Sequence, residues 1–260
     1  TTLGFERRNN PLLNDMPFEE FRGIMTGEFA VRPDNFAEIV ETNRQGPPLL
    51  RDAAPFTELS VRQVEHAVRD GAGIVDTRVP SAFGAAFLPG ALNIGLAPSS
   101  VNWLGVMVPA ETDIVIIANS AAEAEEAAYR FRRAGYDRLI GYRGDGVSAW
   151  SMQGKPLDHL PQLRQAALDH VLEKYSDHVV LDVRTDEEWE DGQIEQAIHV
   201  PLPELMESGV EYASDRHITT VCGSGYRSNI AGSYPKSQGY EHVFSLIGGM
   251  TGWKAFKKNA

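Results

Sequence analysis

The feature that most constrains the fold of this chain is an internal repeat. The segment Val75-Asp76-Thr77-Arg78 matches Leu181-Asp182-Val183-Arg184, 106 positions later, and Ala91-Leu92-Asn93-Ile94 matches Ala197-Ile198-His199-Val200 at the same spacing. Further along, the spacing falls to 104, for residues 114–117 with 218–221 and for Gly135-Tyr136 with Gly239-Tyr240. A two-residue change in loop length explains the shift. The repeat therefore predicts two homologous domains of about 100 residues each.

Within each copy, short β-rich runs alternate with helical patterns. Three buried strands are expected in the second copy, at residues 179–183, 218–221 and 243–247. Thr185 to Glu188 has the pattern of a capping box, which opens a short helix that Gly192 ends. A further helix is expected at 228–238, and Pro235 should kink it or end it early. This alternation indicates an α/β fold in which each copy forms a parallel sheet with helices on both faces.

The composition excludes several classes of protein. Of the 260 residues, 42% are hydrophobic and 23% charged, as in an ordinary globular protein. No apolar run reaches the roughly 18 residues that a membrane span needs. The net charge of −12 argues against nucleic acid or a membrane as partner. The single cysteine, Cys222, excludes an internal disulfide and favours a reducing compartment, so a cytoplasmic location is expected. The first residue is Thr, and we expect a fragment or a processed chain.

One loop carries the residues expected to perform chemistry. Between a strand end and a helix start the chain reads Cys222, Gly223, Ser224, Gly225, Tyr226, Arg227, Ser228. Backbone amides of such a glycine-containing loop can form a nest for an anion, and the following helix adds its positive end. Both effects favour the nucleophilic thiolate of Cys222. Arg227 can hold a charged substrate oxygen with its planar, permanently protonated fork.

This loop resembles the active-site loop of the rhodaneses, in which a cysteine begins a six-residue loop that ends near an arginine. The resemblance extends from about Thr57 to the C-terminus, and it includes Glu188-Trp189 and Gly248-Gly249 with Trp253. It implies that the Cys222 thiolate attacks thiosulfate or a low-molecular-weight persulfide. The resulting cysteine persulfide would pass its outer sulfur to cyanide, a thiol or sulfite. Cys222 and Arg227 would be catalytic, and the remaining loop residues would bind the substrate.

Other interpretations of these residues stay open. Cys222 could be a buried structural thiol, since free cysteine is among the most buried residue types. Asp182 and Arg184 are expected to form a structural ion pair rather than a catalytic one. Tyr226 could shape the mouth of a pocket or be an exposed loop aromatic. A phosphatase of the same fold is a weaker alternative, because those enzymes have five residues between cysteine and arginine and this loop has four.

The first copy is expected to lack activity. The 104-residue spacing places Ala118 opposite Cys222 and Glu123 opposite Arg227, so this copy has no nucleophile. It would serve as a spacer, a docking domain or a packing partner. A non-catalytic module for sulfide sensing or docking is the alternative function for the whole chain. We place the inactive copy at residues 57–157 and the catalytic copy at residues 158–260.

Residues 1–56 do not belong to the repeat. Short amphipathic helices are expected around Phe18 and Phe36. The runs Glu6–Leu12, Phe36–Ile39 and Asn43–Pro47 resemble the C-terminal segment of metallo-β-lactamase-fold persulfide dioxygenases, some of which are fused to tandem rhodanese domains. The resemblance implies an iron-binding domain upstream and a role in sulfide and persulfide metabolism. The seven histidines here lack metal-ligand spacing, so no metal or other cofactor is expected in this chain, although oligomerisation is conceivable.

Overall fold

A computed structural model describes residues 1–13, 15–26, 36–46, 49 and 55–259. The internal contacts divide the chain into two units, Thr1–Arg32 and Pro33–Ala260. The domain limits expected from the sequence, after residues 56 and 157, stay predictions. Among the described residues, no helix is long and apolar enough to cross a membrane.

The N-terminal region forms short helices, as the sequence predicted. They are α1 (Leu3–Asn9), the 3₁₀ helix η1 (Pro11–Leu13), α2 (Phe18–Met25) and α3 (Phe36–Gln45). None of the residues in these four described elements is buried. Phe18, Phe21 and Ile24 of α2 thus expose apolar surface that a globular protein usually covers.

The first copy is a four-stranded parallel sheet with the strand order β2-β1-β3-β4. Its strands are β1 (Gly73–Asp76), β2 (Leu92–Asn93), β3 (Ile114–Ile117) and β4 (Leu139–Arg143). Its helices are α4 (Val61–Arg69), α5 (Pro80–Ala85), α6 (Ser100–Met107), α7 (Ala121–Arg133) and α8 (Ser148–Met152).

The second copy is a five-stranded parallel sheet with the strand order β5-β9-β8-β6-β7. Its strands are β5 (Gln162–Leu163), β6 (Val179–Asp182), β7 (Ala197–His199), β8 (Ile218–Val221) and β9 (Val243–Leu246). Its helices are α9 (Gln165–Lys174), α10 (Asp186–Glu190), α11 (Leu202–Ser208), α12 (Tyr226–Ser237) and α13 (Gly249–Asn259).

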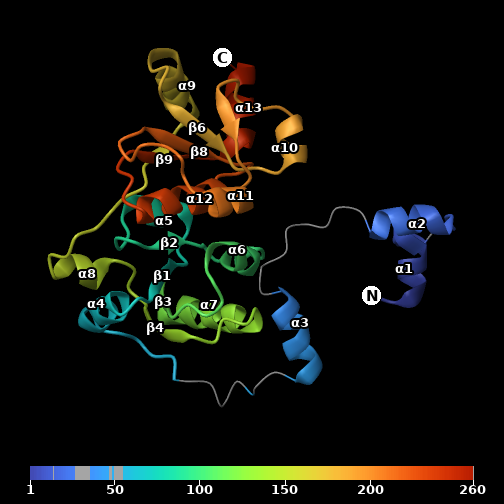
Figure 1. Ribbon diagram of the computed structural model, residues 1–260, viewed down its shortest axis with the longest axis horizontal. Helices are drawn as coiled ribbons and strands as arrows, with labels where there is room; N and C mark the ends of the chain where they lie inside the picture. The colour runs from blue at the N-terminus through green and yellow to red at the C-terminus, as the bar shows by residue number, and fades with distance from the viewer. Residues whose placement is uncertain (14, 27–35, 47–48, 50–54, 260) are drawn as a thin grey trace. The chain divides into compact units, whose positions relative to one another are not determined.

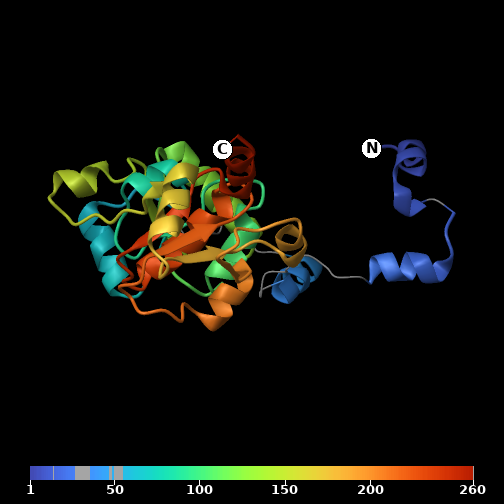
Figure 2. The ribbon, with the colours of Figure 1, turned by 90° about the horizontal axis from the view of Figure 1, so that it is seen from above.

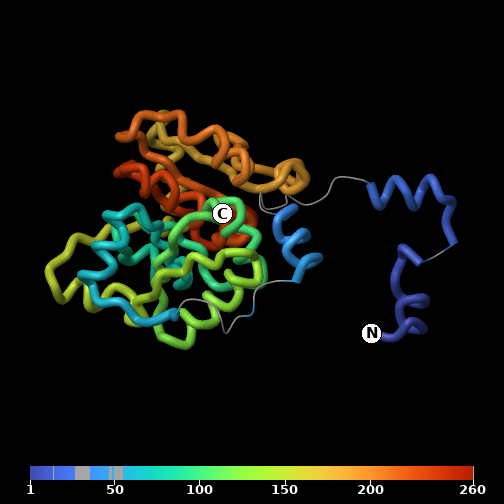
Figure 3. Tube along the Cα trace, turned by 60° about the horizontal axis from the view of Figure 1, so that its bottom comes forward, coloured from blue at the N-terminus to red at the C-terminus, as the bar shows by residue number. Residues whose placement is uncertain are grey.

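The topology confirms the repeat. When β1, β2, β3 and β4 are matched with β6, β7, β8 and β9, both sheets have the same strand order. The fifth strand, β5, also has a counterpart, because Glu58 makes a parallel bridge to Tyr142 of β4. Figure 3 follows the chain from the first copy, in cyan and green, into the second, in yellow to red.

The core follows the alternation of side chains along the strands. In β3, Ile114 and Ile116 join one cluster of buried residues and Val115 and Ile117 join another, because successive side chains point to opposite faces of a sheet. In the second copy α9 and α13 cover one face of the sheet, and α11 and α12 cover the other (Figure 1; seen from above in Figure 2). Two of the clusters contain buried residues of both copies, so the copies share part of their core.

Helix α12 lies between the two copies. It packs on β8 and β9 of its own sheet and on β2 and α5 of the first copy (Figure 1). Two of its buried polar residues bond to the first copy, as buried polar groups need partners. Asn229 Nδ2 donates to Asn93 Oδ1 at 2.6 Å, and Ser233 Oγ accepts from the backbone amide of Asn93 at 3.0 Å. Packing on both sides holds the helix in place.

Two details of α12 differ from the sequence expectation. The helix begins at Tyr226, two residues before the expected start, because Gly225 adopts a left-handed conformation that lets the helix start directly after it. Pro235 does not end the helix early, since α12 continues to Ser237. The proline lies in the last turn, where the Gln238 amide donates to the carbonyls of Tyr234 and Pro235 and closes the helix.

Candidate active site

Cys222 directly follows β8, a central strand, and lies at the start of the loop that enters α12. The first residues of α13 hold this loop. The Met250 amide donates to the Cys222 carbonyl at 2.7 Å, and the Thr251 amide and hydroxyl donate to the Gly223 carbonyl at 3.0 and 2.9 Å. Both carbonyls are thereby tied to α13, and the loop is fixed from outside.

Gly249 makes this contact possible. Its φ is +52°, and a Cβ there would lie 2.2 Å from the Cys222 carbonyl oxygen, far inside van der Waals contact. The sequence alone gave Gly248-Gly249 only as part of a family resemblance. The structure supplies the reason, which is the close approach of α13 to the loop.

The sulfur of Cys222 faces hydrogen-bonding groups from the loop. The Gly225 amide donates to Sγ at 3.1 Å, and Sγ lies 3.6 Å from Ser228 Oγ. Ser228 Oγ lies 3.0 Å from Ser245 Oγ, so two buried hydroxyls back the site. The Gly225 amide is placed to stabilise negative charge on the sulfur. Of the predicted loop, Ser224 is exposed and Cys222 itself has no exposed surface.

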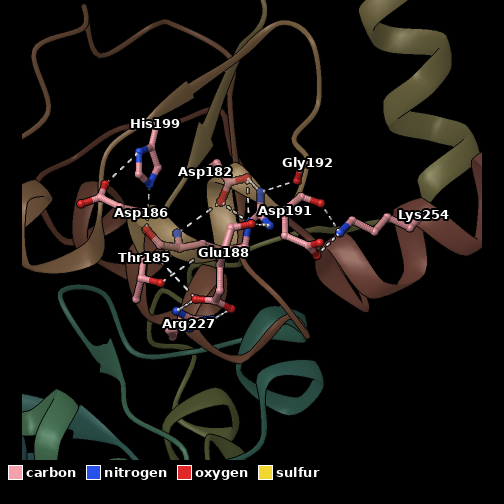
Figure 4. Close-up of polar contacts among 10 residues, drawn as sticks. Asp182, Thr185, Asp186, Glu188, Asp191, Gly192, His199, Arg227 and Lys254 are labelled. Atoms are coloured by element: carbon pink, nitrogen blue, oxygen red, sulfur yellow. Dashed lines mark hydrogen bonds and ion pairs between the residues drawn. The ribbon is translucent and has the colours of Figure 1, made fainter. Parts of the chain in front are cut away.

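Arg227 does not point free into solvent. It forms a two-armed ion pair with Glu188 of α10, with Nη1–Oε2 and Nη2–Oε1 distances of 2.6 Å each (Figure 4). The hydrogen bond from Arg227 is the main reason that the pKa of Glu188 lies below its ordinary value. Burial opposes the charge of Arg227, but the bond to Glu188 and the nearby Cys222 thiolate outweigh it and raise its pKa. Sequence reasoning missed this partner, which is 39 positions away.

Glu188 is itself held on two sides. Its Oε2 accepts the Thr185 amide at 3.2 Å, and Thr185 Oγ1 accepts the Glu188 amide at 3.4 Å, which confirms the predicted capping box. The guanidinium of Arg184 donates to the carbonyl of Glu188, in the middle of α10, and to that of Gly192, just after the helix. Glu188 and Arg227 therefore meet as two groups with fixed supports.

Asp182 and Arg184 form the buried ion pair expected from the sequence. Arg184 Nε lies 2.8 Å from Oδ1 of Asp182, and Nη2 lies 2.7 Å from Oδ2. The same pair occurs in the first copy, where Arg78 Nη2 lies 2.6 Å from Asp76 Oδ2. Because the pair is present in the copy that lacks a cysteine, its geometry does not depend on the chemistry of Cys222.

The corresponding loop of the first copy has a different chemistry. Ala118 takes the place of Cys222, and the Gly146 amide donates to its carbonyl at 2.8 Å, as Met250 does to Cys222. Glu123, the counterpart of Arg227, folds back and accepts from the amide and the side chain of Asn119 at 3.0 and 2.9 Å. In this loop a carboxylate thus occupies the sequence position at which the second copy has the guanidinium of Arg227.

Tyr226 is not the exposed loop aromatic that was one of its two expected roles, and its role at the mouth of a pocket stays a prediction. It is half-buried, and its hydroxyl donates to the Gly95 carbonyl of the first copy at 2.7 Å. Burial raises the pKa of this phenol to about 12. The residue therefore connects the cysteine loop to the neighbouring copy. Sequence patterns gave no signal for this contact, because it joins residues 131 positions apart.

The histidines are less scattered than the sequence indicated. The ring centroids of His217 and His242 lie 4.4 Å apart, and those of His178 and His217 lie 6.3 Å apart. In the described part of the chain, however, no group of three or more His, Cys, Asp or Glu residues is arranged to hold a metal ion.

Comparison with known proteins identifies the repeated unit. Residues 60–153 and 165–256 each match the family described as rhodanese-like domain. The chain is similar to the putative sulfurtransferase YtwF of Bacillus subtilis, 31% identical over 38% of this chain and 95% of that protein. It is 32% identical to the thiosulfate sulfurtransferase GlpE of Coxiella burnetii over 32% of this chain and 78% of that protein.

A third relative is longer than the matched region. The putative sulfur carrier protein YrkF of Bacillus subtilis is 31% identical over 36% of this chain, and the match spans about half (51%) of that protein. The two matched segments together cover most of this chain, and both adopt the same α/β topology. The chain therefore belongs to the rhodanese-like family and contains two copies of its domain.

Proposed function

We propose that this protein is a sulfurtransferase that carries a sulfane sulfur as a persulfide of Cys222. The thiolate attacks the outer sulfur of a donor, the donor's S–S bond breaks, and the leaving group departs as sulfite from thiosulfate or as a thiolate from a persulfide. A thiol, sulfite or cyanide then takes the outer sulfur and restores the thiolate. The observation that carries the proposal is the Gly225 amide directed at Cys222 Sγ at 3.1 Å.

Two further observations support the proposal. The carbonyls of Cys222 and Gly223 are tied to α13, which leaves the loop's inner side to groups that donate hydrogen bonds. The similar proteins YtwF and GlpE are described as a putative sulfurtransferase and a thiosulfate sulfurtransferase. The proposal requires no cofactor in this chain, and a reducing compartment such as the cytoplasm would keep the lone cysteine reduced.

One observation favours a different function. Cys222 has no exposed surface, as a structural thiol would, and a donor reaches its sulfur only if the loop opens. The alternative is a non-catalytic module for sulfide sensing or docking.

The exposed apolar residues of α2 support our further proposal that residues 1–56 belong to an upstream metallo-β-lactamase-fold domain, as in persulfide dioxygenase fusions. A natural polypeptide that begins near Thr1, found by mass measurement, would remove its basis.

Intact-mass measurement separates the two functions. After treatment with thiosulfate or an organic persulfide, we expect a gain of one sulfur atom on the peptide that contains Cys222, and cyanide should remove it. The Cys222→Ser variant should gain nothing. If no donor adds sulfur to the wild-type protein, the docking function is the better explanation. Turnover of an aryl phosphate without sulfur loading would indicate a phosphatase instead.

A further inference from the structure

We infer that Glu188 determines the donor class, selecting organic persulfides over thiosulfate by neutralising Arg227. This inference rests on the proposed function and deepens it. Arg227 supplies the positive charge of the loop Cys222–Ser228, and both of its arms are bound to the carboxylate of Glu188. The site therefore offers an ion pair, with no net charge, where a free guanidinium would have offered a binding site for an anion.

The two donor classes differ in the charge that they bring to this site. Thiosulfate carries two negative charges, and its sulfonate oxygens need a local cation. A small organic persulfide carries at most one negative charge, on its sulfane sulfur, and has no sulfonate group that needs a cation. The protein as a whole carries a net charge of −12 and adds repulsion for a dianion. Neutralising the loop cation thus disfavours thiosulfate more than a persulfide.

Glu188 lies close enough to the thiol loop to act on a bound donor. A Cβ placed on Gly223 would lie 3.2 Å from Glu188 Oε1 and 3.4 Å from Arg227 Nη2, so both groups flank the first peptide after Cys222. The side chain of Glu188 is 37% exposed and that of Arg227 is 19% exposed. The carboxylate is therefore the more accessible of the two, and an approaching donor meets it.

The ion pair is difficult to displace. To reach Arg227, a thiosulfate sulfonate would have to break two hydrogen bonds of 2.6 Å, and the displaced carboxylate would remain nearby. The capping box with Thr185 and the bonds from Arg184 to the carbonyls of Glu188 itself and of Gly192 hold Glu188 where it is. Glu188 acts through Arg227 and is a positioning residue that determines specificity.

The test is single-turnover loading of Cys222 by two donors, thiosulfate and the persulfide of 2-mercaptoethanol. Glu188→Gln removes the charge but keeps a side chain that suits a capping box. We expect its rate constant for loading from thiosulfate to rise by about tenfold or more, while loading from the persulfide changes less than about twofold. Glu190→Gln is the matched control, because Glu190 is an exposed residue of the same helix. It removes one charge and should leave both rates unchanged.

The outcomes separate this inference from the proposed function. If Glu188→Gln changes both rates alike, or neither, the inference is wrong while sulfur transfer stands. If neither donor loads any variant, the proposed function fails and the inference fails with it. Should Glu188→Gln not fold, the wild-type protein still decides: sulfate, an unreactive dianion, should not slow loading from the persulfide. Inhibition by low concentrations of sulfate would show that Arg227 is open to dianions.

Discussion

The two copies share a framework and differ at one loop. Both contain the same parallel strand order and the same buried Asp–Arg pair, whose arginine also donates to a backbone carbonyl eight residues ahead, at Ala86 in the first copy and Gly192 in the second. In both copies a backbone amide donates to the carbonyl of the residue that follows the central strand, β3 or β8. The amide comes from the segment after β4 in the first copy and after β9 in the second. At that residue one copy has Ala118 and the other has Cys222.

This difference separates the features that both copies share from those to which the proposed function assigns chemistry. The features common to both copies, such as the buried ion pair, are compatible with a loop that has no nucleophile. The features found in the second copy alone are the thiol, the Gly225 amide directed at it, and the Arg227–Glu188 pair. The first copy contributes a surface that holds α12 in place. On this surface Asn93 bonds to Asn229 and Ser233, and Gly95 bonds to Tyr226.

The strongest test of the comparison removes the nucleophile. We expect Cys222→Ser to lower sulfur transfer at least about a thousandfold, because covalent catalysis cannot proceed without the thiolate. The matched variant Ala118→Ser changes the equivalent residue of the first copy and should leave transfer per folded molecule unchanged. Steady-state transfer from a persulfide to cyanide measures both. Residual transfer well above background in Cys222→Ser would mean that the first copy is not silent.

The shared ion pairs give the next largest effect, this time on stability. Asp76→Asn and Asp182→Asn each leave a buried arginine without its counterion, since both pairs are almost completely buried. We expect each change to destabilise the protein by about 3–5 kcal/mol. Denaturant unfolding measures the loss, and hydrogen exchange assigns it to one copy. Similar losses would confirm equivalent roles. A loss confined to Asp182→Asn would show that the pair is needed in the second copy alone.

Acid should affect the stability of the two copies differently. The second copy contains His178, whereas the first has Ala72 at the equivalent position, 106 residues earlier. Burial, with a smaller contribution from the charge of His217, lowers the pKa of His178 to about 4 from an ordinary 6.5. Between these two values the unfolded chain binds the proton and the folded protein does not. Stability is therefore complete above pH 6.5 and is lost as the pH falls towards 4, by about 2–3 kcal/mol.

The variant His178→Gln tests this pH dependence, because glutamine can still bond to Thr219 Oγ1, the partner of His178 at 2.7 Å. We expect its free energy of unfolding to change less between pH 7 and pH 4.5 than that of the wild-type protein. His159→Gln is the control, since the side chain of His159 is 67% exposed. An unchanged pH dependence in His178→Gln would assign the acid sensitivity to other groups.

Sequence patterns predicted the parts of this structure that are local or repeated. The α/β class, the strands, the capping box at Thr185 and the Asp182–Arg184 pair all follow from neighbouring residues or from the repeat. The contacts that define the site do not. Glu188 meets Arg227 across 39 positions and Tyr226 meets Gly95 across 131, and a single sequence has no periodicity that encodes such distances. The expectation of an early end of α12 at Pro235 was wrong, because the proline lies in the last turn of the helix, and the alternative of a kink stays a prediction.

The smallest effect is expected at the contact between the copies. Tyr226→Phe removes one hydrogen bond, from the hydroxyl to the Gly95 carbonyl, and should destabilise the protein by about 1 kcal/mol. Tyr240→Phe is the control, because its hydroxyl donates to Val210 and Tyr212 within the second copy. Hydrogen exchange should show weaker protection around Gly95 in Tyr226→Phe but not in Tyr240→Phe. If neither variant alters exchange in the first copy, then Tyr226 does not couple the cysteine loop to its neighbour, and the copies are joined without it, by the bonds of Asn229 and Ser233 to Asn93 and by the packing of α11 on α6.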